Sequence, residues 1–231
     1  MYGYITWDII LGLCWLLLYS FQKNIRSKIL WGSIIALPFG FGELYFIPNY
    51  WIPQTLFNFG IKYHLAIESF LVMFFLGGLA AAVYEAALQK YKMHHPKCCG
   101  NICFCYLSLG VALASFIILL KTFPLLNIIY SSILACFIGG IFAFFVYPEL
   151  RSHIFLGGLF FMFLYGITLF VSEILVPGWI AATWNLSLIS GVVLFKIPLE
   201  ELLFGFAFGT LWSPLYEEIC SNFKTFNRCF R

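Results

Sequence analysis

Charged residues are scarce in this sequence. Only 10% of its 231 residues are Asp, Glu, Lys or Arg, whereas 62% are hydrophobic and the mean hydropathy is +0.94. Soluble globular domains carry about 25% charged residues, which face water. The composition therefore excludes a soluble domain and indicates a protein surrounded by lipid.

Aspartate is nearly absent, and several catalytic motifs are missing. Asp8 is the only aspartate, so the chain lacks the paired aspartate clusters that hold Mg²⁺-diphosphate and the aspartate pair of intramembrane proteases. No GxGxxG motif follows a strand, no Ser/His/Asp set is visible, and no zinc-protease motif occurs. We therefore expect no cofactor, no catalytic metal and no nucleic-acid partner.

Long apolar runs dominate the rest of the chain. About 20 such residues suffice to cross a bilayer as a helix, and in lipid the backbone must satisfy its own hydrogen bonds. The runs lack the alternation of barrel strands, so we predict an all-α polytopic membrane protein with about seven transmembrane helices. The predicted helices lie near residues 3–21, 29–47, 62–88, 102–120, 126–147, 154–176 and 197–219.

The basic residues between these helices predict the orientation. Ten of the thirteen follow the first, third, fifth and seventh helices, and only Lys62, Lys121 and Lys196 lie on the opposite side. Basic residues favour the cytoplasmic side, so we predict a multi-pass protein of the cell membrane with its N-terminus outside and its C-terminus in the cytoplasm. The first run has no basic residue before it, which argues against a cleaved signal peptide.

The sequence contains an internal duplication. From Glu200 the spacing is eight residues to Gly209 and six more to Tyr216-Glu217, and the same spacing starts at Glu68. We predict one membrane domain, 1–231, built from two parallel three-helix repeats. These are residues 1–88 and 126–219, joined by a connector helix at 102–120 and followed by a cytoplasmic tail at 220–231.

Two irregular segments occupy equivalent places after the second and sixth helices. Pro48 to Gly60 and Pro177 to Ser190 are rich in Trp, Pro and Asn. Their tryptophans fit interfacial anchors, while their equivalence favours a half-inserted lid or rim. Both interpretations stay open.

The glutamates form two layers. From Glu200 to Glu217 is about 25 Å along a helix. Carboxylates in a membrane are costly and commonly functional. We interpret the inner layer (Glu85, Glu217, Glu218) as interfacial decoration and the outer layer as functional. The alternative is that the outer glutamates only cap helix N-termini.

Basic groups precede two of these glutamates by four residues. His64 precedes Glu68, and Lys196 precedes Glu200. On one helix face each would pair with its carboxylate. However, Ile197 precedes a proline and is biased away from helix, so the pairing at Glu200 stays open.

A cysteine cluster lies in the loop after the third helix. Cys98, Cys99, Cys103 and Cys105 follow a pair of histidines. Metal sites usually need two CxxC-like pairs, which are absent here. Reduced thiols or juxtamembrane lipidation fit better, and the role of the cluster stays open.

The second copy of the duplication resembles a known family. Pro198-x-Glu200-Glu201 followed by Phe204 is similar to the motif of the lycopene cyclase domain, the small non-flavin type of carotenoid cyclase found as two subunits or one fused chain. The resemblance covers about 43–85 and 173–218. In the first copy only Glu68 remains, without the proline or the second glutamate.

The resemblance implies a cofactor-free isomerase of the intramolecular lyase class. An acid protonates the ψ end of lycopene, an internal alkene attacks the cation, and proton loss gives a β ring, as in γ- or β-carotene. Aromatic faces can stabilise such cations. The predicted catalytic residues are Glu200, Glu201, Glu68, Glu43 and Glu173. The predicted substrate-binding residues are Pro198, Phe204, Trp51, Trp179, Trp184 and Phe70.

The predicted partners are a lipophilic carotenoid or other isoprenoid taken from the bilayer, and membrane lipids. Association with itself or with other carotenoid enzymes stays open. Two alternatives belong to other classes. One is a small proton-coupled transporter, in which repeats and membrane glutamates serve proton coupling. The other is a non-catalytic isoprenoid-binding protein.

Overall fold

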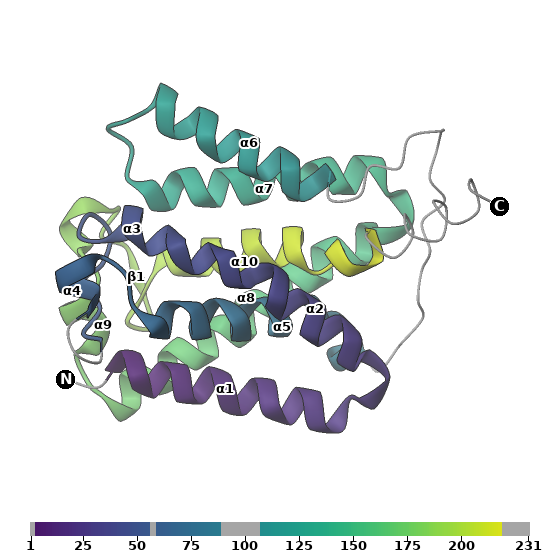
Figure 1. The fold of residues 1–231 in the computed structure, drawn as a ribbon, viewed down its shortest axis with the longest axis horizontal. Helices are drawn as coiled ribbons and strands as arrows, with labels where there is room; N and C mark the ends of the chain where they lie inside the picture. Colours follow the sequence, from purple (N-terminus) through teal and green to yellow (C-terminus); the bar gives the residue numbers. More distant parts are fainter. Residues whose placement is uncertain (1–2, 56–58, 89–106, 219–231) are drawn as a thin grey trace.

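The computed structural model describes residues 3–55, 59–88 and 107–218, and it is a bundle of helices (Figure 1). The longer helices are α1 (Gly3–Phe21), α2 (Arg26–Ala36), α5 (Ile67–Leu88), α6 (Leu107–Thr122), α7 (Ile128–Val146), α8 (Arg151–Leu175) and α10 (Leu199–Trp212). The short elements are η1 (Lys23–Ile25), η2 (Leu37–Gly42), α3 (Glu43–Phe46), α4 (Phe59–Tyr63), η4 (Pro148–Leu150), α9 (Trp179–Thr183), η5 (Leu186–Leu188) and the antiparallel strands β1 (Val193–Leu194) and β2 (Ile197–Pro198).

The helices have the length and composition of a membrane protein. Five described segments are long and apolar enough to cross a bilayer, namely Gly3–Phe21, Lys23–Phe46, Ile67–Leu88, Ile128–Val146 and Pro148–Leu175, while α6 is a shorter apolar helix. This confirms the all-α membrane class. The count of seven spans and the division into repeats stay predictions.

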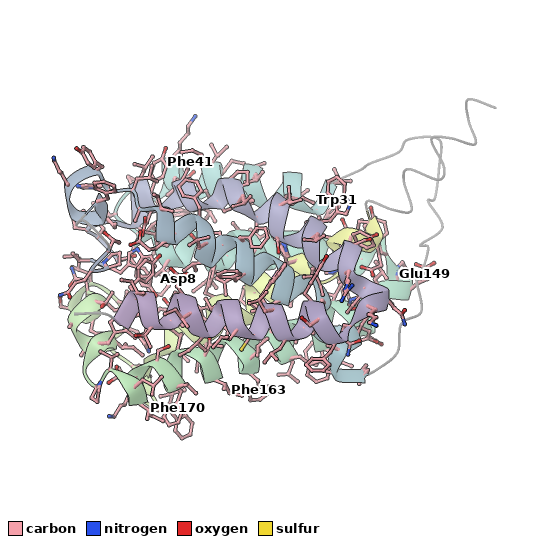
Figure 2. All side chains as sticks on the ribbon, turned by 60° about the horizontal axis from the view of Figure 1, so that its bottom comes forward. Asp8, Trp31, Phe41, Glu149, Phe163 and Phe170 are labelled. Carbon is pink, nitrogen blue, oxygen red and sulfur yellow. The ribbon has the colours of Figure 1, made fainter. Side chains whose placement is uncertain are left out.

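Large apolar side chains project outward along the bundle. Phe41, Phe163 and Trp31 are each more than half exposed, and Figure 2 shows them on the outside, with Asp8 within the bundle. In water such a surface would be an aggregation hazard. Against hydrocarbon it is the expected lipid-facing surface.

The chain alternates direction, so functional segments collect at two ends. In Figure 1, α1, α5, α7 and α10 run one way, and α2, α6 and α8 run the other. The short elements α3, α4 and α9 and the strands gather at one end, here called the tryptophan end because Trp51, Trp179 and Trp184 lie there. The opposite end is called the lysine end, after Lys28. The orientation of these ends in a membrane stays a prediction.

Three predicted helices differ from the observed ones. The predicted helix 29–47 is broken, because α2 ends at Ala36 and Pro38 and two glycines form η2 before α3 begins. Proline lacks the N–H that an α-helix needs, and glycine weakens a helix. The predicted helix 62–88 starts at Ile67, after His64 adopts a φ of 54°. The last begins at Leu199, because Ile197 and Pro198 form β2.

Glycines let neighbouring helices approach closely within each predicted repeat. A Cβ on Gly77 of α5 would lie 2.3 Å from the Ala36 Cβ of α2, and one on Gly209 of α10 would lie 2.8 Å from the Gly158 Cα of α8. Small residues at such contacts allow the backbone-to-backbone packing that holds helices together in lipid. Gly77 and Gly209 are the two equivalent glycines of the duplication.

A buried ion cluster ties both copies together at the lysine end. Lys28 Nζ donates to Glu85 Oε1 (2.6 Å) and to Glu217 Oε1 (2.8 Å), and it lies 3.3 Å from His153 Nε2. Lys28 is 1% exposed, and the two glutamates are also buried. The interpretation of this layer as interfacial decoration is therefore wrong for Glu85 and Glu217, the equivalent residues of the duplication. The third member, Glu218, accepts a hydrogen bond from Ser108 (2.5 Å).

We predict that Lys28→Met destabilises the fold strongly. The change leaves two buried carboxylates without their cation, a defect that costs about 3–5 kcal/mol in buried ion pairs. Thermal unfolding in detergent should show a much lower Tm than for Lys23→Met, the matched change at an exposed lysine. Adding Glu85→Gln and Glu217→Gln to Lys28→Met should restore part of the loss. Equal Tm values for Lys28→Met and the native chain would contradict a structural role of the cluster.

Candidate active site

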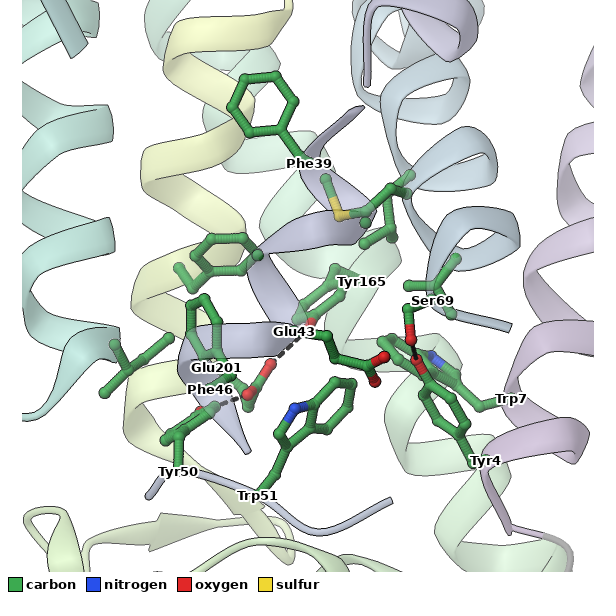
Figure 3. A pocket seen from close by; sticks show the side chains of 17 residues that line it. Tyr4, Trp7, Phe39, Glu43, Phe46, Tyr50, Trp51, Ser69, Tyr165 and Glu201 are labelled. Carbon is green, nitrogen blue, oxygen red and sulfur yellow. Dashed lines mark hydrogen bonds between the residues drawn. The ribbon is translucent and has the colours of Figure 1, made fainter. Parts of the chain in front are cut away.

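A cavity with several polar side chains in its wall lies at the tryptophan end of the bundle. It encloses about 610 Å³, including the open space at its mouth. Its walls come from α1, η2, α3, α5, α7, α8, α10 and the segment after α3. They are mostly apolar and aromatic, with two carboxylates, Glu43 and Glu201 (Figure 3).

Glu201 is surrounded by hydrogen-bond donors. Oε1 accepts from the Tyr50 hydroxyl and from Trp184 Nε1 (2.7 Å), and Oε2 accepts from the Tyr165 hydroxyl. The glutamate is 4% exposed. Three converging donors offset the cost of burying a carboxylate. The side chain is therefore held in one orientation at the cavity wall.

Tyr50 lies outside the membrane-spanning helices, in the segment after α3. Burial, together with the neighbouring Glu201 carboxylate, raises the pKa of the Tyr50 hydroxyl well above its usual range. The hydroxyl therefore remains protonated throughout the physiological pH range, and it keeps its role as a donor to Glu201.

Glu43 has one oxygen bound and one oxygen open to the cavity. It is the first residue of α3, where η2 delivers it to the cavity wall. Oε2 accepts from the Ala66 N–H (3.0 Å), while Oε1 is buried and has no hydrogen-bond partner within the described ranges. Figure 3 shows the carboxyl group pointing into the cavity, between Glu201 and Ser69. An unpaired buried carboxyl oxygen is costly and available to a ligand.

In the first copy of the duplicated spacing, a serine stands where the second copy has Glu201. Ser69 follows Glu68 as Glu201 follows Glu200, and its hydroxyl lies 3.0 Å from the Tyr4 hydroxyl on α1. Tyr4 and Ser69 line the cavity, whereas Glu68 is buried outside the lining. The two copies thus provide different groups at equivalent positions.

The side chains of the predicted pair Glu200-Glu201 point in different directions from α10. Successive residues of an α-helix point about 100° apart, and only Glu201 lines the cavity. Glu200 Oε1 accepts from the Tyr130 hydroxyl (2.7 Å) and the Ser190 N–H (2.9 Å), away from the cavity. Its catalytic role stays a prediction.

Glu173 likewise lies outside the cavity. Its two oxygens accept from the N–H groups of Gly178 (2.8 Å) and Ile180 (3.0 Å), so it holds the start of α9. This geometry agrees with the capping alternative for this residue. Glu43, by contrast, combines such a backbone contact with a position in the cavity wall.

The two irregular segments meet and cover this end of the cavity. Trp51 and Trp184 form an isolated antiparallel bridge. Ile52 N–H donates to Thr183 O (2.7 Å), and Asn185 N–H donates to Tyr50 O (2.8 Å). Because these contacts join the residues after α3 to the residues after α9, the segments form one cap, as the lid interpretation expects.

The predicted aromatic residues have different positions. Trp51 and Phe204 line the cavity, and Trp184 contacts it through Glu201. Trp179 packs edge-on to Trp184, with ring centroids 5.2 Å apart. Two predicted binding residues lie outside the lining: Phe70 packs against Phe41, and Pro198 precedes α10. Their substrate-binding role stays a prediction.

Neither proposed pair of a basic group with a glutamate one turn later forms on a helix face. His64 Nδ1 lies 3.1 Å from Ile47 O, before α5 begins. Lys196 lies in the turn between β1 and β2, with a φ of 66°. The Cys98, Cys99, Cys103 and Cys105 cluster lies outside the described residues.

Several cavity residues were not predicted from the sequence. These are Tyr50 and Tyr165, which donate to Glu201, and Tyr4, Trp7 and Ser69 on the opposite wall. Tyr50 stands beside Trp51 in a segment that the sequence does single out. Tyr165 lies on the apolar helix α8, and nothing in its position along that helix distinguishes it from a residue that packs in the core.

The fold and site define a class: a polytopic α-helical membrane protein with carboxylates buried in an aromatic cavity. The family model described as lycopene cyclase matches residues 127–219. This match confirms the resemblance predicted for residues 173–218 and covers the region from α7 through α10, while the predicted first region, 43–85, lies outside it. No curated protein and no solved structure matches the chain significantly.

We predict that the fold requires a hydrogen-bond acceptor at position 201, because three buried donors converge there. Glu201→Leu leaves two hydroxyls and an indole N–H without an acceptor, and each buried unsatisfied group costs about 1–3 kcal/mol. Its Tm in detergent should fall well below that of Glu201→Gln, whose amide keeps an acceptor oxygen. A Leu variant as stable as the Gln variant would show that the donors have other acceptors.

Proposed function

We propose that this protein is a carotenoid cyclase that forms β rings at the ψ ends of lycopene, or of a related carotenoid, by proton transfer from buried glutamates. The match to the lycopene cyclase family supports an enzymatic role in carotenoid cyclisation generally. The observation that carries the finer proposal is the pair of carboxyl groups, Glu43 and Glu201, on the wall of one aromatic cavity.

In this proposal Glu43 is the general acid. An ionised Glu43 would leave a charged oxygen, Oε1, unpaired in an apolar cavity, which is unfavourable. A protonated carboxyl group has an O–H that can be given to an alkene instead. Protonation of the terminal double bond of the ψ end generates a tertiary carbocation, which the internal alkene attacks to close the ring.

Glu201 is the proposed base and counter-ion. Donors from Tyr50, Tyr165 and Trp184 would give an ionised Glu201 three hydrogen bonds, which offset part of the cost of its burial. A carboxylate in that position can stabilise the cation and then remove the proton that completes the β ring. The atoms balance without an oxidant, because one proton enters and one leaves. Return of the proton from Glu201 to Glu43 resets the site.

The aromatic walls suit a cationic intermediate. The rings of Tyr4 and Trp51 meet edge to face at 5.2 Å, and those of Trp7 and Tyr165 at 5.7 Å. All four residues line the cavity. Ring faces attract cations by about 2 kcal/mol or more where water is excluded, so the walls would stabilise the charge without reacting with it.

A proton-coupled transporter remains the alternative from another class. Buried charges at both ends of the bundle are the observation in its favour. The mostly apolar cavity favours an isoprenoid lipid over a polar solute. The pigment assay described next separates the two functions.

We predict that lycopene-accumulating cells expressing the native chain produce γ- or β-carotene, measured by chromatography and absorption. Glu43→Gln and Glu201→Gln should each lower the yield by about 10²–10⁴-fold, the usual contribution of general acid–base catalysis. Glu200→Gln should have a smaller effect, because Glu200 faces away from the cavity.

Glu149→Gln, at an exposed position, is the matched control and should cyclise like the native chain. Untouched lycopene despite normal membrane expression of the native chain would refute the cyclase proposal. Loss of activity in Glu200→Gln alone would instead move the acid role to Glu200.

A second prediction concerns the source of the proton. Conversion in D₂O should place deuterium in each ring that forms, because the acid exchanges with solvent between turnovers. Mass spectrometry of the product measures the label, and unreacted lycopene should remain unlabelled. An unlabelled ring would contradict cyclisation initiated by an exchangeable acid.

A further inference from the structure

A second cavity adjoins the first one along α10. It encloses about 730 Å³, and its walls come from η2, α3, α5, α6, α7 and α10. Phe39, Gly42, Phe46, Met73 and Phe204 line both cavities. The two spaces are therefore neighbours that share a wall, with the carboxylates confined to the first.

The second cavity offers almost nothing to a polar ligand. The polar side chains of its lining are Ser132 and Cys136. Ser132 Oγ already donates to Ile128 O of its own helix (3.0 Å), and a thiol is a weak donor. A site of this kind selects by shape and apolar contact alone.

A ladder of aromatic rings runs from one cavity into the other. Phe204, Phe208 and Trp212 stand at successive turns of α10. The centroids of Phe204 and Phe208 are 5.6 Å apart with planes at 29°, and those of Phe208 and Trp212 are 4.8 Å apart at 13°. The ladder covers about 12 Å along the helix. Rings stacked in this way present their edges along the row, and aromatic edges pack favourably against a π face such as that of a conjugated chain.

The cavity also reaches the lipid-facing side of the bundle. Leu113 of α6 lines it and is 42% exposed, whereas Ala135 of α7 lines it and is 3% exposed. A lipid-soluble ligand could therefore enter beside α6 without passing through water.

We propose that the second cavity binds the unreacting chain of the substrate, a linear conjugated polyene, while its end reacts between Glu43 and Glu201. This inference rests on the proposed function. It adds a second site, which holds the rest of the polyene and so favours substrates that are long enough to fill it. The continuity of the two cavities and the aromatic ladder carry it. A phospholipid acyl chain is the competing occupant.

The test uses Ala135→Phe, which fills the second cavity from its buried wall, and Leu134→Phe, a matched change at a neighbouring exposed position. Two ligands are compared in liposomes: lycopene, and a shortened polyene with the same ψ end that is too short to leave the first cavity. Bound pigment on the purified protein is measured by absorption, and products by chromatography.

The native chain and Leu134→Phe should bind lycopene and convert both ligands. Ala135→Phe should lose at least about tenfold in lycopene binding and conversion, because its ring occupies the space that the polyene chain needs, and it should still convert the short polyene. If Ala135→Phe does not fold, Leu113→Trp fills the same cavity from its half-exposed side, and the same pattern is expected.

Undiminished lycopene binding in a filled variant, or equal loss with both ligands, would overturn the inference. Lycopene binding to the native chain that falls as phospholipid is added would assign the cavity to acyl chains and also overturn it. Binding that depends on the second cavity, without any cyclised product, would instead refute the proposed function and leave the polyene site standing.

Discussion

The cost of burying carboxylates in a lipid-surrounded bundle is the constraint on which the rest of this structure depends. An isolated ionised carboxylate in an apolar medium is strongly unfavourable, so each one needs donors or a cation from elsewhere in the chain. Glu201 obtains donors from Tyr50, Tyr165 and Trp184, which lie in three different segments. These contacts fix where the cap, α8 and α10 meet, and so they shape the cavity.

The two ends of the bundle meet this constraint in different ways. At the lysine end a single cation, Lys28, is shared by Glu85 and Glu217, and this ion cluster serves stability. At the tryptophan end Glu43 keeps a buried oxygen without a partner among the described residues. The glutamates that share Lys28 hold helices together, whereas Glu43 has no ion pair among the described residues and faces a cavity. The ends therefore differ in role although both carry buried glutamates.

The duplication in the sequence leads to an asymmetric site. Gly77 and Gly209 have equivalent packing roles, and both copies contribute to the Lys28 cluster. At the cavity, however, Ser69 stands where the second copy has Glu201. Glu201 belongs to the second copy of the duplicated spacing, and Glu43 lies upstream of the first copy, which gives two carboxyl groups in unlike surroundings. Unlike surroundings allow one group to act as acid and the other as base.

The helical membrane class, the duplication, the family resemblance and the candidate glutamates could be predicted from the sequence, because apolar run length, spacing and motif are local properties of the chain. The packing of the helices was needed to show that Glu201 faces the cavity and Glu200 does not, that Tyr50 and Tyr165 bind Glu201, and that Lys28 is buried. The rotation of a helix and the partners of a buried group depend on contacts between distant segments, which spacing along one chain does not encode.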